Sequence, residues 1–495
     1  MTEPQLPRIQ GRAPRVLSLV YNDASNDSRV LKTAASLQQA GAQVQILGSA
    51  RDLAGHPAGV VQVRGLRVRR VPDLIVPLVF PRLTRLWRRL AGKDPVTGQR
   101  AAADDGAARP PGDRPVGTGV LGEEHDGAAP GPSSVAGHGG AGGTGAPAAP
   151  DGGAVSTGHS PATRAKAFAA DAWMRLYQTC RLGFWWKGAV GEGRRLCPDV
   201  VHANDANALV PALLIAAGRR TRIVYDSHEL WRRRNTRQDK WLAPAAEAVI
   251  ERIGIRRAAG VITVSPSIAD WLQHTYRLTE KPSLVRNIPA ATAVPDPARG
   301  RLRELTGLRR EDKIIAYTGG VTTGRGLEET VDAVAHLPRD VHLVLLGPTD
   351  ATYTAGLLHR ADAAGVGDRV HLAGVVPYPE VPQALADADV AVVFVRPICL
   401  SYTYSLPNKL FESIHAGLPI VAADLPDTAE IVRRYGIGEV FAPERPDELA
   451  ASITHILTGA QGYRAASRRA AAELTWEHEA GVLVDLYRRA LEELR

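Results

Sequence analysis

Short apolar runs alternate with helix-like segments along most of this chain, and the alternation begins twice. In the first half, RVLSLVY (15–21) is followed by a polar loop and then by RVLKTAASLQQAG (29–41), whose apolar residues recur at helical spacing. A chain that repeats strand, helix and strand forms a parallel sheet with helices on both of its faces. The strand-like runs of the first series are residues 15–21, 44–48, 199–204, 222–228 and 261–265.

The pattern starts again after RNIPAATAVPDP (286–297), a stretch with proline and without periodicity that indicates an interdomain link. KIIAYTGG (313–320) leads into the helical pattern GLEETVDAVAHL (326–337). We therefore predict an α/β protein of two Rossmann-like, doubly wound domains that face a cleft, because ligands bind outside the carboxyl ends of parallel strands. The strand-like runs of the second series are residues 313–320, 341–347, 369–374, 390–395 and 419–424.

The domain boundaries follow from these two series and from one region of unusual composition. We predict a first domain over residues 1–290, a second over 298–475, and a final helix, 476–495, that packs back across the first domain. Within residues 101–160, Gly, Ala and Pro make up 36 of 60. Such a segment cannot bury enough apolar surface to offset its ordering entropy. A disordered insertion over about 94–164 is therefore expected in the first domain.

The charge of the chain is compatible with several kinds of partner. The formal net charge is +8, and 52 of the 60 basic residues are arginine. This balance suits nucleic acid, an anionic membrane surface or phosphorylated small molecules, but the codon bias of a GC-rich genome gives the same composition. Because the arginines are dispersed and no stacking motif accompanies them, we expect no nucleic-acid partner.

The chain carries the features of a cytoplasmic protein. Its cysteines, Cys180, Cys197 and Cys399, are too few and too scattered for a disulfide framework or a Cys-rich metal site. We find no run of about 18 apolar residues and no secretory signal. Two segments that combine basic and aromatic residues, 74–92 and 165–190, fit either ordinary packed helices or a peripheral contact with the anionic inner face of a membrane.

The loop TGGVTTGRGLEE, which follows a strand and opens a helix, is a candidate phosphate site. Glycines at 319, 320, 324 and 326 would let the backbone approach a ligand, and Arg325 adds a positive charge beside a helix N-terminus. The spacing does not match G-x-G-x-x-G, which argues against a dinucleotide dehydrogenase. A glycine-rich turn with a solvated arginine is the simpler interpretation of the loop alone.

A second candidate site lies in SLPNKLFESIHAGLPIVAAD (405–424). We expect a helix that begins after Pro407, with Lys409 in its first turn and Glu412 on the same face. A lysine there opposes the helix dipole, which makes sense if an anion docks beside it. Glu412 could then accept hydrogen bonds from a ribose diol. Taken alone, the pair also fits an ordinary surface ion pair.

At this point the sequence resembles a known family. The segments PNKLFE and GLPIVAAD look like the donor-binding signature of GT-B glycosyltransferases of the large family 4, in the subgroup with NDSRV and SLPNKLFE. NDSRVLKTAASLQQAGAQV, VYDSHEL and TWEHEAGVLVDLY are similar to further segments of that family, and the resemblance covers most of the chain except 74–198. It implies a GT-B fold, a nucleotide sugar donor in the second domain, and a hydroxyl acceptor in the first.

The resemblance also implies roles for individual residues. Glu412 would hold the ribose, Arg325 and Lys409 would contact the diphosphate, and His228 would lie near the reacting sugar. The chain departs from the family where a glutamate is replaced by Tyr404 and where a second basic residue is replaced by Gly320. The expected sites are therefore catalytic His228, Arg325 and Lys409; donor-binding Gly319, Gly320, Arg325, Asn408, Lys409 and Glu412; and acceptor or sugar contacts Asn22, Arg29, His228 and Tyr404.

The expected reaction is transfer of a sugar from a nucleoside diphosphate sugar to a glycan, a lipid-linked or a secondary-metabolite hydroxyl. The resemblance implies retention at the anomeric carbon, with the diphosphate taking the acceptor proton. Cationic side chains and helix N-termini can stabilise the leaving group, so we expect no metal and no cofactor. Alternatives are a phosphorylase, a nucleotide-sugar epimerase, or a non-catalytic scaffold that binds nucleotide sugars.

Several other polar residues are assigned structural roles. Asp387 and Asp389 form a D-x-D sequence at a helix–strand junction, where we expect caps rather than metal ligands. Asp226, His228 and Glu229 follow one strand and point in different directions, which argues against a shared ion. We expect core positions for the two strand histidines and find no partner that marks Cys399 as a nucleophile. The two histidines are His202 and His371.

Overall fold

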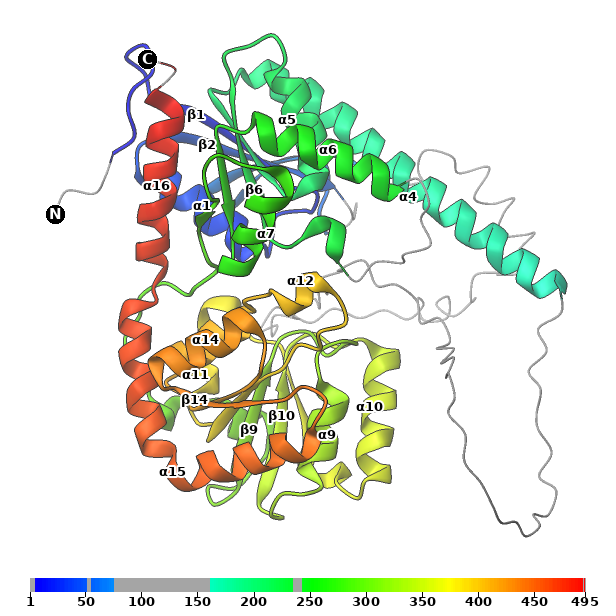
Figure 1. The fold of residues 1–495 in the computed structure, drawn as a ribbon, viewed down its shortest axis with the longest axis vertical. Coiled ribbons are helices and arrows are strands. Elements are labelled where there is room, and N and C mark those ends of the chain that lie inside the picture. Colours follow the sequence, from blue (N-terminus) through cyan, green and yellow to red (C-terminus); the bar gives the residue numbers. More distant parts are fainter. Residues whose placement is uncertain (1–4, 51–54, 75–160, 235–242, 493, 495) are drawn as a thin grey trace, which may run out of the picture.

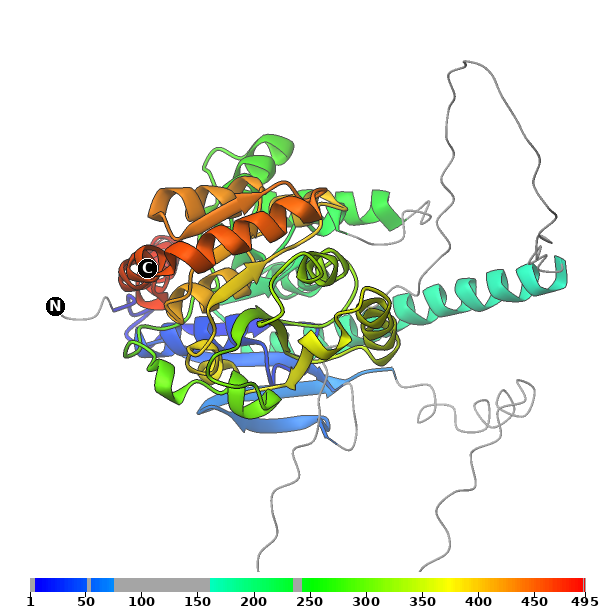
Figure 2. The same ribbon diagram turned by 90° about the horizontal axis from the view of Figure 1, so that it is seen from below.

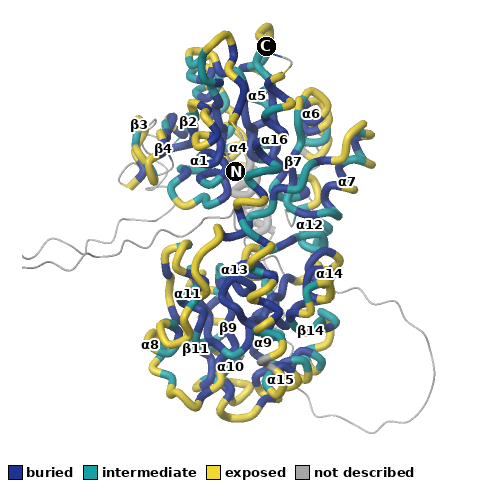
Figure 3. The backbone as a smooth tube through the Cα atoms, turned by 90° about the vertical axis from the view of Figure 1, so that its left-hand side faces the viewer, coloured by how far each residue is buried: buried dark blue, intermediate teal, exposed yellow. Residues whose placement is uncertain are grey.

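The computed structural model describes residues 5–50, 55–74, 161–234, 243–492 and 494. They form two α/β units, each built around one sheet, and the chain finishes on the first unit (Figure 1). Figure 3 shows buried residues running through the middle of both units, where the strands lie. The fold class predicted from the sequence is confirmed: both sheets are dominated by parallel strands.

The first sheet has eight strands in the order β3-β4-β2-β1-β5-β6-β7-β8. All neighbouring strands pair in parallel except β3 and β4. The strands are β1 Arg15–Leu19, β2 Gln43–Ala50, β3 Gly59–Val63, β4 Leu66–Pro72, β5 Val200–Asn204, β6 Arg222–Ser227, β7 Gly260–Thr263 and β8 Ser283–Leu284.

The antiparallel hairpin of β3 and β4 was not among the predicted elements. Its turn is formed by Arg64 and Gly65, which both have positive φ angles, 49° and 78°. Two residues with positive φ are what a tight hairpin turn with the twist of its strands requires. The hairpin places β4 beside β2, where it adds a parallel strand to the sheet, and β3 forms the antiparallel edge.

Helices flank the first sheet, and the start of the first helix is determined by a capping residue. The side chain of Asp27 accepts a hydrogen bond from the backbone N–H of Val30 and so caps the helix that follows. The helical elements of the first unit are α1 Ser28–Gln39, α4 Pro161–Leu196, η1 Ala206–Ala208, α5 Leu209–Ala216, η2 Trp231–Arg233, α6 Ala243–Arg257 and α7 Pro266–Tyr276.

The second sheet has six strands, all parallel, in the order β11-β10-β9-β12-β13-β14. The strands are β9 Lys313–Thr318, β10 Val341–Leu346, β11 Val370–Gly374, β12 Val390–Val393, β13 Ile420–Ala423 and β14 Gly438–Phe441. The helical elements are η3 Pro297–Arg299, α8 Leu302–Thr306, α9 Leu327–Val334, α10 Ala351–Ala363, η4 Gly367–Arg369, η5 Tyr378–Glu380, α11 Val381–Leu385, α12 Leu400–Thr403, α13 Asn408–His415, α14 Pro426–Tyr435 and α15 Pro446–Glu473.

The chain returns to the first unit through its last two helices. α15 has one residue with non-helical angles, Gly459, and is followed at once by α16, Trp476–Glu492. Apolar residues of α16, among them Leu483 and Tyr487, pack in one cluster with Val16 and Val200 of the first sheet. The last helix therefore belongs to the core of the first unit although it follows the second in sequence (Figure 1).

Helix α4 extends well beyond the first unit, as Figures 1 and 2 both show. It begins at Pro161, so residues 161–164, which we had expected within the disordered insertion, form its first turn. The remainder of that predicted insertion, 94–160, lies outside the described residues, as does most of segment 74–92. In the part of the chain that the structure describes, no helix combines the length and apolar character needed to span a membrane.

Candidate functional site

The loops that follow the parallel strands of the two sheets meet at the boundary between the units. Ser267, at the start of α7, donates hydrogen bonds from its hydroxyl (2.9 Å) and its backbone N–H to the carboxylate of Asp427 in α14. The backbone N–H of Leu230 donates to the hydroxyl of Ser401 in α12 at 3.2 Å. These bonds join loops of the two domains along one interdomain surface.

The glycine loop between β9 and α9 packs closely against the neighbouring strand ends. Gly319 has a φ of 119°, and the α carbon of Gly347 approaches its carbonyl so closely that a β carbon there would collide with it. Gly326 has a φ of 68°, and a β carbon at this position would collide with the ring of Phe394. These glycines allow a backbone path that other residues would strain.

Two cations of the second domain lie beside this loop. Lys409 is only 6% exposed, and its ammonium lies 3.9 Å from the centre of the Tyr317 ring. Burial, together with the positive charge of Arg325, holds the pKa of Lys409 well below its usual value, while Glu412 acts in the opposite direction. The Nε atom of Arg325 is buried and has no hydrogen-bond partner among the described residues.

A desolvated lysine next to a second cation is electrostatically unfavourable. Negative charge placed between Arg325 and Lys409 would relieve both the repulsion and the loss of hydration. Perturbed groups of this kind concentrate at functional sites. The pair therefore has the chemistry of an anion site, lined on one side by the backbone of Gly319 and Gly320.

Glu412 lies one turn after Lys409 on α13 and is 6% exposed. Its negative charge helps to raise the pKa of two tyrosines, Tyr317 and Tyr378, although burial is the larger cause for both. At the exposed start of the same helix, the side-chain oxygen of Asn408 accepts a hydrogen bond from an amide of the first domain. A buried carboxylate thus lies on the same helix as Lys409, and its contact with a ribose stays a prediction.

The first domain contributes a histidine held between two carboxylates. The ring nitrogens of His228 lie 3.4 Å from Asp205 and 3.3 Å from Asp226, and a fifth of its side chain is exposed. Burial alone would lower the pKa of His228, but the two carboxylates outweigh it and raise the pKa to about 9. The ring is therefore an imidazolium at neutral pH and can donate, but not accept, a proton.

Two other predicted contacts of the first domain are engaged in internal bonds. Arg29 is buried and pairs in bidentate fashion with Asp226, at 2.9 and 2.6 Å. The amide of Asn22 donates to Asp27 and its oxygen accepts from the backbone N–H of Ala24, so it orders its own loop. Their predicted contact with acceptor or sugar stays a prediction, and the structure gives both a role in shaping the site.

Tyr404, the position where the chain departs from the family pattern, lies at the end of α12. Its carbonyl accepts a hydrogen bond from the hydroxyl of Ser265 at 2.6 Å, and its side chain packs against the core of the first domain. The residue therefore joins the two domains.

Lys32 of α1 is a site-lining group that sequence reasoning missed. Its ammonium donates to the carbonyl of Ile288 at 2.6 Å and lies 4.6 Å from the centre of a Trp476 ring. Burial, with a smaller effect of Arg29, lowers the pKa of Lys32 to about 7, although Glu412 and two other glutamates oppose this. The sequence does contain Lys32, as the last residue of NDSRVLK. The direction of its side chain, however, is set by the interdomain link, and the local sequence does not reveal it.

The D-x-D aspartates have the structural roles that the sequence indicated. Asp387 accepts hydrogen bonds from the backbone N–H groups of Leu302 and Arg303 at the start of α8. Asp389 accepts one from Ile314 at the start of β9. Among the described residues, no group of three or more His, Cys, Asp or Glu side chains is arranged to hold a metal ion.

The two strand histidines differ in their burial. His202 is fully buried in β5, as expected for a core position. His371 is half-buried on β11, and its Nε2 lies 3.1 Å from Nδ1 of His342 on the neighbouring strand. His371 therefore has the partner expected of it, but the expected core position is wrong, because β11 forms the edge of its sheet.

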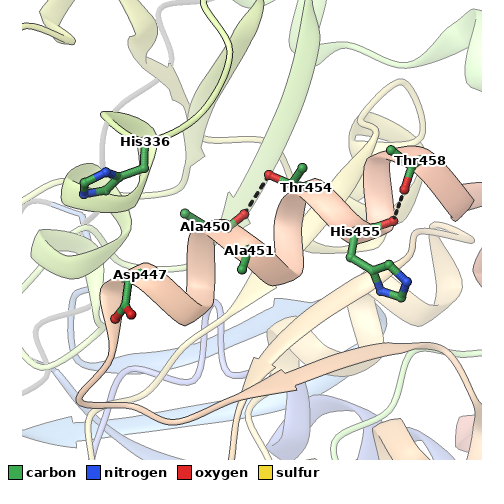
Figure 4. Close-up of a pocket in the computed structure, with 7 residues that line it drawn as sticks. All are labelled: His336, Asp447, Ala450, Ala451, Thr454, His455 and Thr458. Carbon is green, nitrogen blue, oxygen red and sulfur yellow. Dashed lines mark hydrogen bonds between the residues drawn. The ribbon is translucent and has the colours of Figure 1, made fainter.

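A separate hollow of about 520 Å³ lies between the end of α9 and the first turns of α15 (Figure 4). His336 borders it at the opposite end of α9 from the glycine loop. The hydroxyls of Thr454 and Thr458 bond to backbone carbonyls of their own helix, so neither is directed at a ligand. The hollow is therefore remote from the candidate site and lacks its chemistry.

Two Rossmann-like sheets whose strand ends face each other define a protein of the GT-B architecture. Comparison with known families agrees. The model described as glycosyl transferases group 1 matches residues 312–459, and that described as glycosyltransferase family 4 matches residues 171–288, together more than half of the chain. The chain belongs to this family of glycosyltransferases.

The chain is also similar to curated proteins over part of its length. It is 31% identical over 203 residues to a D-inositol 3-phosphate glycosyltransferase of Mycobacterium marinum, a match that covers 39% of this chain and 42% of the relative. The corresponding protein of Xylanimonas cellulosilytica is 31% identical over 209 residues, 39% of this chain and 46% of the relative. The match thus spans less than half the length of these curated relatives.

Solved structures match almost the whole fold at low sequence identity. A sucrose-phosphate synthase from Thermosynechococcus elongatus has a TM-score of 0.63 and 15% identity, covering 97% of this chain and 100% of that chain. Anabaena Alr3699/HepE in complex with UDP-glucose has a TM-score of 0.58 and 14% identity, covering 97% and 99%. At this identity the likeness establishes the shared fold.

Proposed function

We propose that this protein transfers a sugar from a nucleoside diphosphate sugar to a hydroxyl acceptor. The observation that carries the proposal is the cationic pair of a buried Lys409 and a half-buried Arg325, next to the glycine loop and to Glu412. The pair has the charge and the shielding that a diphosphate needs, and Glu412 is placed to accept hydrogen bonds from a ribose. The complex of the Anabaena neighbour with UDP-glucose supports the same class of donor.

In the proposed mechanism, the C–O bond between sugar and diphosphate breaks while the acceptor hydroxyl attacks from the same face. Arg325, Lys409 and the backbone N–H of Gly320 stabilise the charge that grows on the leaving oxygen, while the N–H of Gly319 donates to the carbonyl of Leu346 and holds the loop in place. The diphosphate takes the acceptor proton, and the anomeric configuration is retained. Asn408 lies at the start of the same helix and completes the donor side.

His228 is assigned to the sugar rather than to proton abstraction. With a pKa raised to about 9, the imidazolium holds its proton at neutral pH and cannot serve as the general base. It can donate a hydrogen bond to a sugar hydroxyl from the first domain. Asn22, Arg29 and Tyr404 would act by shaping the loops on this side of the boundary.

Two measurements test the transferase proposal. Purified protein incubated with a panel of nucleotide sugars should slowly release a nucleoside diphosphate and free sugar, and the first-formed anomer, read by NMR, should keep the donor configuration. Glu412→Ala should weaken binding of the cognate diphosphate tenfold to a hundredfold, since charge-assisted hydrogen bonds are worth about 1.5–3 kcal/mol. Release of a sugar phosphate would instead indicate a phosphorylase, and no reaction with any donor would favour a scaffold.

We propose that the reaction needs no metal, because two cationic side chains already face the leaving group. Turnover should persist in EDTA. Loss of activity in chelator, restored by magnesium or manganese, would contradict this proposal.

The acceptor is proposed to reach the site from the first domain, as a glycan, a lipid-linked or a secondary-metabolite hydroxyl. Helix α4 carries three exposed apolar side chains: Trp173, Leu176 and Phe184 are 52%, 57% and 40% exposed. A peripheral contact of α4 with the cytoplasmic face of a membrane would cover these side chains.

Sedimentation with anionic vesicles tests that contact. Replacing Trp173, Leu176 and Phe184 together by alanine should abolish co-sedimentation. Replacing Val294, an exposed valine of the interdomain link, should leave it unchanged. No binding of the parent protein to anionic vesicles would contradict the membrane proposal and leave the transferase proposal intact.

A further inference from the structure

A buried histidine of the first sheet, His202, connects the last helix of the chain with the candidate site. Its Nδ1 lies 2.8 Å from the hydroxyl of Tyr487 on α16, and its Nε2 lies 3.4 Å from Oδ2 of Asp226. His202 and Tyr487 are both fully buried, with 0% of their surface exposed. Neither residue has a role in the mechanism given above.

The partners of His202 determine which of its nitrogens carries the proton. An ionised carboxylate can only accept hydrogen bonds, so the proton of a neutral His202 belongs on Nε2, facing Asp226. The pKa of Asp226 is well below its usual value: burial would raise it, but Arg29, His228 and His202 together more than offset burial. Nδ1 must then accept, and the hydroxyl of Tyr487 is the group that donates to it. Asp226 and Tyr487 thus favour the same tautomer of His202 from the two sides of its ring.

The oxygen that His202 faces is also the one that forms an ion pair with the site histidine, His228. Oδ2 of Asp226 accepts a hydrogen bond from Nε of Arg29 at 2.9 Å and lies 3.3 Å from Nε2 of His228. Three nitrogen-bearing side chains therefore converge on a single carboxylate oxygen. If His202 stops donating a hydrogen bond to Asp226, the charge and orientation of the Asp226 carboxylate beside His228 change.

The helix that carries Tyr487 is anchored on the first domain by strong contacts of its own. Glu479, 1% exposed, accepts hydrogen bonds from the backbone and the guanidinium of Arg286. The indole N–H of Trp476 donates to the hydroxyl of Ser36 on α1 at 2.9 Å. These contacts hold α16 in place without the hydroxyl of Tyr487, so that hydroxyl can be removed while the helix stays docked.

We propose that Tyr487 is a positioning residue of the transferase site, which acts on His228 through the tautomer of His202 and the carboxylate of Asp226. The inference rests on the proposed function for its effect on turnover. The chain of contacts from Tyr487 to His228 can be tested independently of any substrate.

The test compares Tyr487→Phe with Tyr276→Phe in full-length protein labelled with ¹⁵N at histidine. Tyr276 is also a buried tyrosine of the first domain, 1% exposed, but its hydroxyl bonds to Glu251. In the parent, NMR should show His202 protonated on Nε2. Tyr487→Phe should give a mixture of tautomers and raise the pKa of His228, because Asp226 loses a competing donor. Tyr276→Phe should change neither signal.

Kinetics with the cognate nucleotide sugar complete the test. Tyr487→Phe should lower kcat severalfold and leave the KM for the donor at the parental value, whereas Tyr276→Phe should leave both unchanged. A parent His202 protonated on Nδ1, or a Tyr487→Phe variant whose histidine signals match the parent, would overturn the inference. A parent that turns over no nucleotide sugar, but whose signals change as expected, would contradict the proposed function and keep the Tyr487–His228 connection.

Discussion

At the scale of single residues, the buried ammonium of Lys409 lies in surroundings that disfavour its charge. Its pKa is far below the usual range because burial and Arg325 disfavour its charged form. A diphosphate bound beside it favours the charged form and raises the pKa again. Nucleotide binding and proton uptake are therefore coupled at this residue.

Calorimetry should detect this coupling. Binding of the cognate nucleoside diphosphate at a pH between the lowered pKa of Lys409 and its ordinary value should take up protons, seen as a binding enthalpy that depends on the ionisation enthalpy of the buffer. Affinity should fall as the pH rises above the pKa that Lys409 has before the diphosphate binds. Lys409→Arg, whose side chain stays charged at all these pH values, should bind the diphosphate without taking up a proton at this position. Equal proton uptake by the parent and Lys409→Arg would show that another group is responsible.

His228 gives a second prediction for a single residue, and its pKa is shifted upward rather than downward. Its pKa is raised to about 9, above the unfolded value of about 6.5. The charged ring therefore contributes stability that is complete below pH 6.5 and is lost as the pH rises through about 9. Asp205→Asn should lower the pKa of His228, measured by NMR titration. Asp199→Asn, which removes the partner of Arg12 elsewhere in the domain, should not. Equal His228 titrations in the two variants would contradict the assignment.

At the scale of elements, the glycine loop is held against the strand ends by residues that tolerate no side chain. Gly326 combines a φ of 68° with a close approach to Phe394. Gly307 has a similar φ of 72°, but open space where its β carbon would lie. Alanine at Gly307 would therefore show only the cost of the backbone angle. Alanine at Gly326 would show that cost together with the clash against Phe394.

Gly326→Ala should destabilise the second domain more than Gly307→Ala does. A non-glycine residue in the left-handed region costs about 1–3 kcal/mol, which both variants share. Only Gly326→Ala also displaces Phe394 from the core. Urea unfolding curves of the two variants and the parent give the comparison. Equal losses of unfolding free energy would show that the loop can shift away from Phe394.

Most strands could be predicted from the sequence because their signal is local. The runs at 15–21 and 341–347, for example, contain β1 and β10 and exceed them by only one or two residues. The hairpin of β3 and β4 was missed because its exposed residues weaken the apolar signal, although the pair Arg64 and Gly65 marked the turn.

The candidate site could be predicted in part, and the missed residues share a physical reason. Glu412, Lys409 and Arg325 occur in local motifs with a recognisable pattern. Tyr487 and Lys32 act through contacts between segments hundreds of residues apart, and such contacts leave no pattern in a single sequence. Asp205, which follows β5 directly, could have been found from its place after a strand.

At the scale of the whole molecule, the two domains are joined by more than the interdomain link. α16 completes the core of the first domain, and hydrogen bonds such as that between Ser267 and Asp427 connect the facing loops. The arrangement of the donor and acceptor sides therefore depends on residues from both ends of the chain.

Deleting residues 100–160 should leave both the fold and nucleotide binding unchanged. The composition of this segment cannot form a core, and the closure entropy of a flexible loop changes by only about 0.6 kcal/mol per doubling of its length. The melting temperature and the affinity for the cognate nucleoside diphosphate are the quantities to measure. A melting temperature lower by about ten degrees, well beyond the loop-closure effect, would show that the segment supports the folded core.

The central claim is that the second domain binds the nucleoside diphosphate of a sugar donor through Arg325 and Lys409. Thermal unfolding of the parent and of Arg325→Ala against a panel of nucleoside mono- and diphosphates tests it most directly. The claim predicts that one diphosphate stabilises the parent, by about 2.7 kcal/mol at 100 times its Kd. It also predicts a smaller effect of the matching monophosphate and little effect of either on Arg325→Ala. A panel in which no diphosphate stabilises the parent, or in which Arg325→Ala responds equally, would contradict the claim.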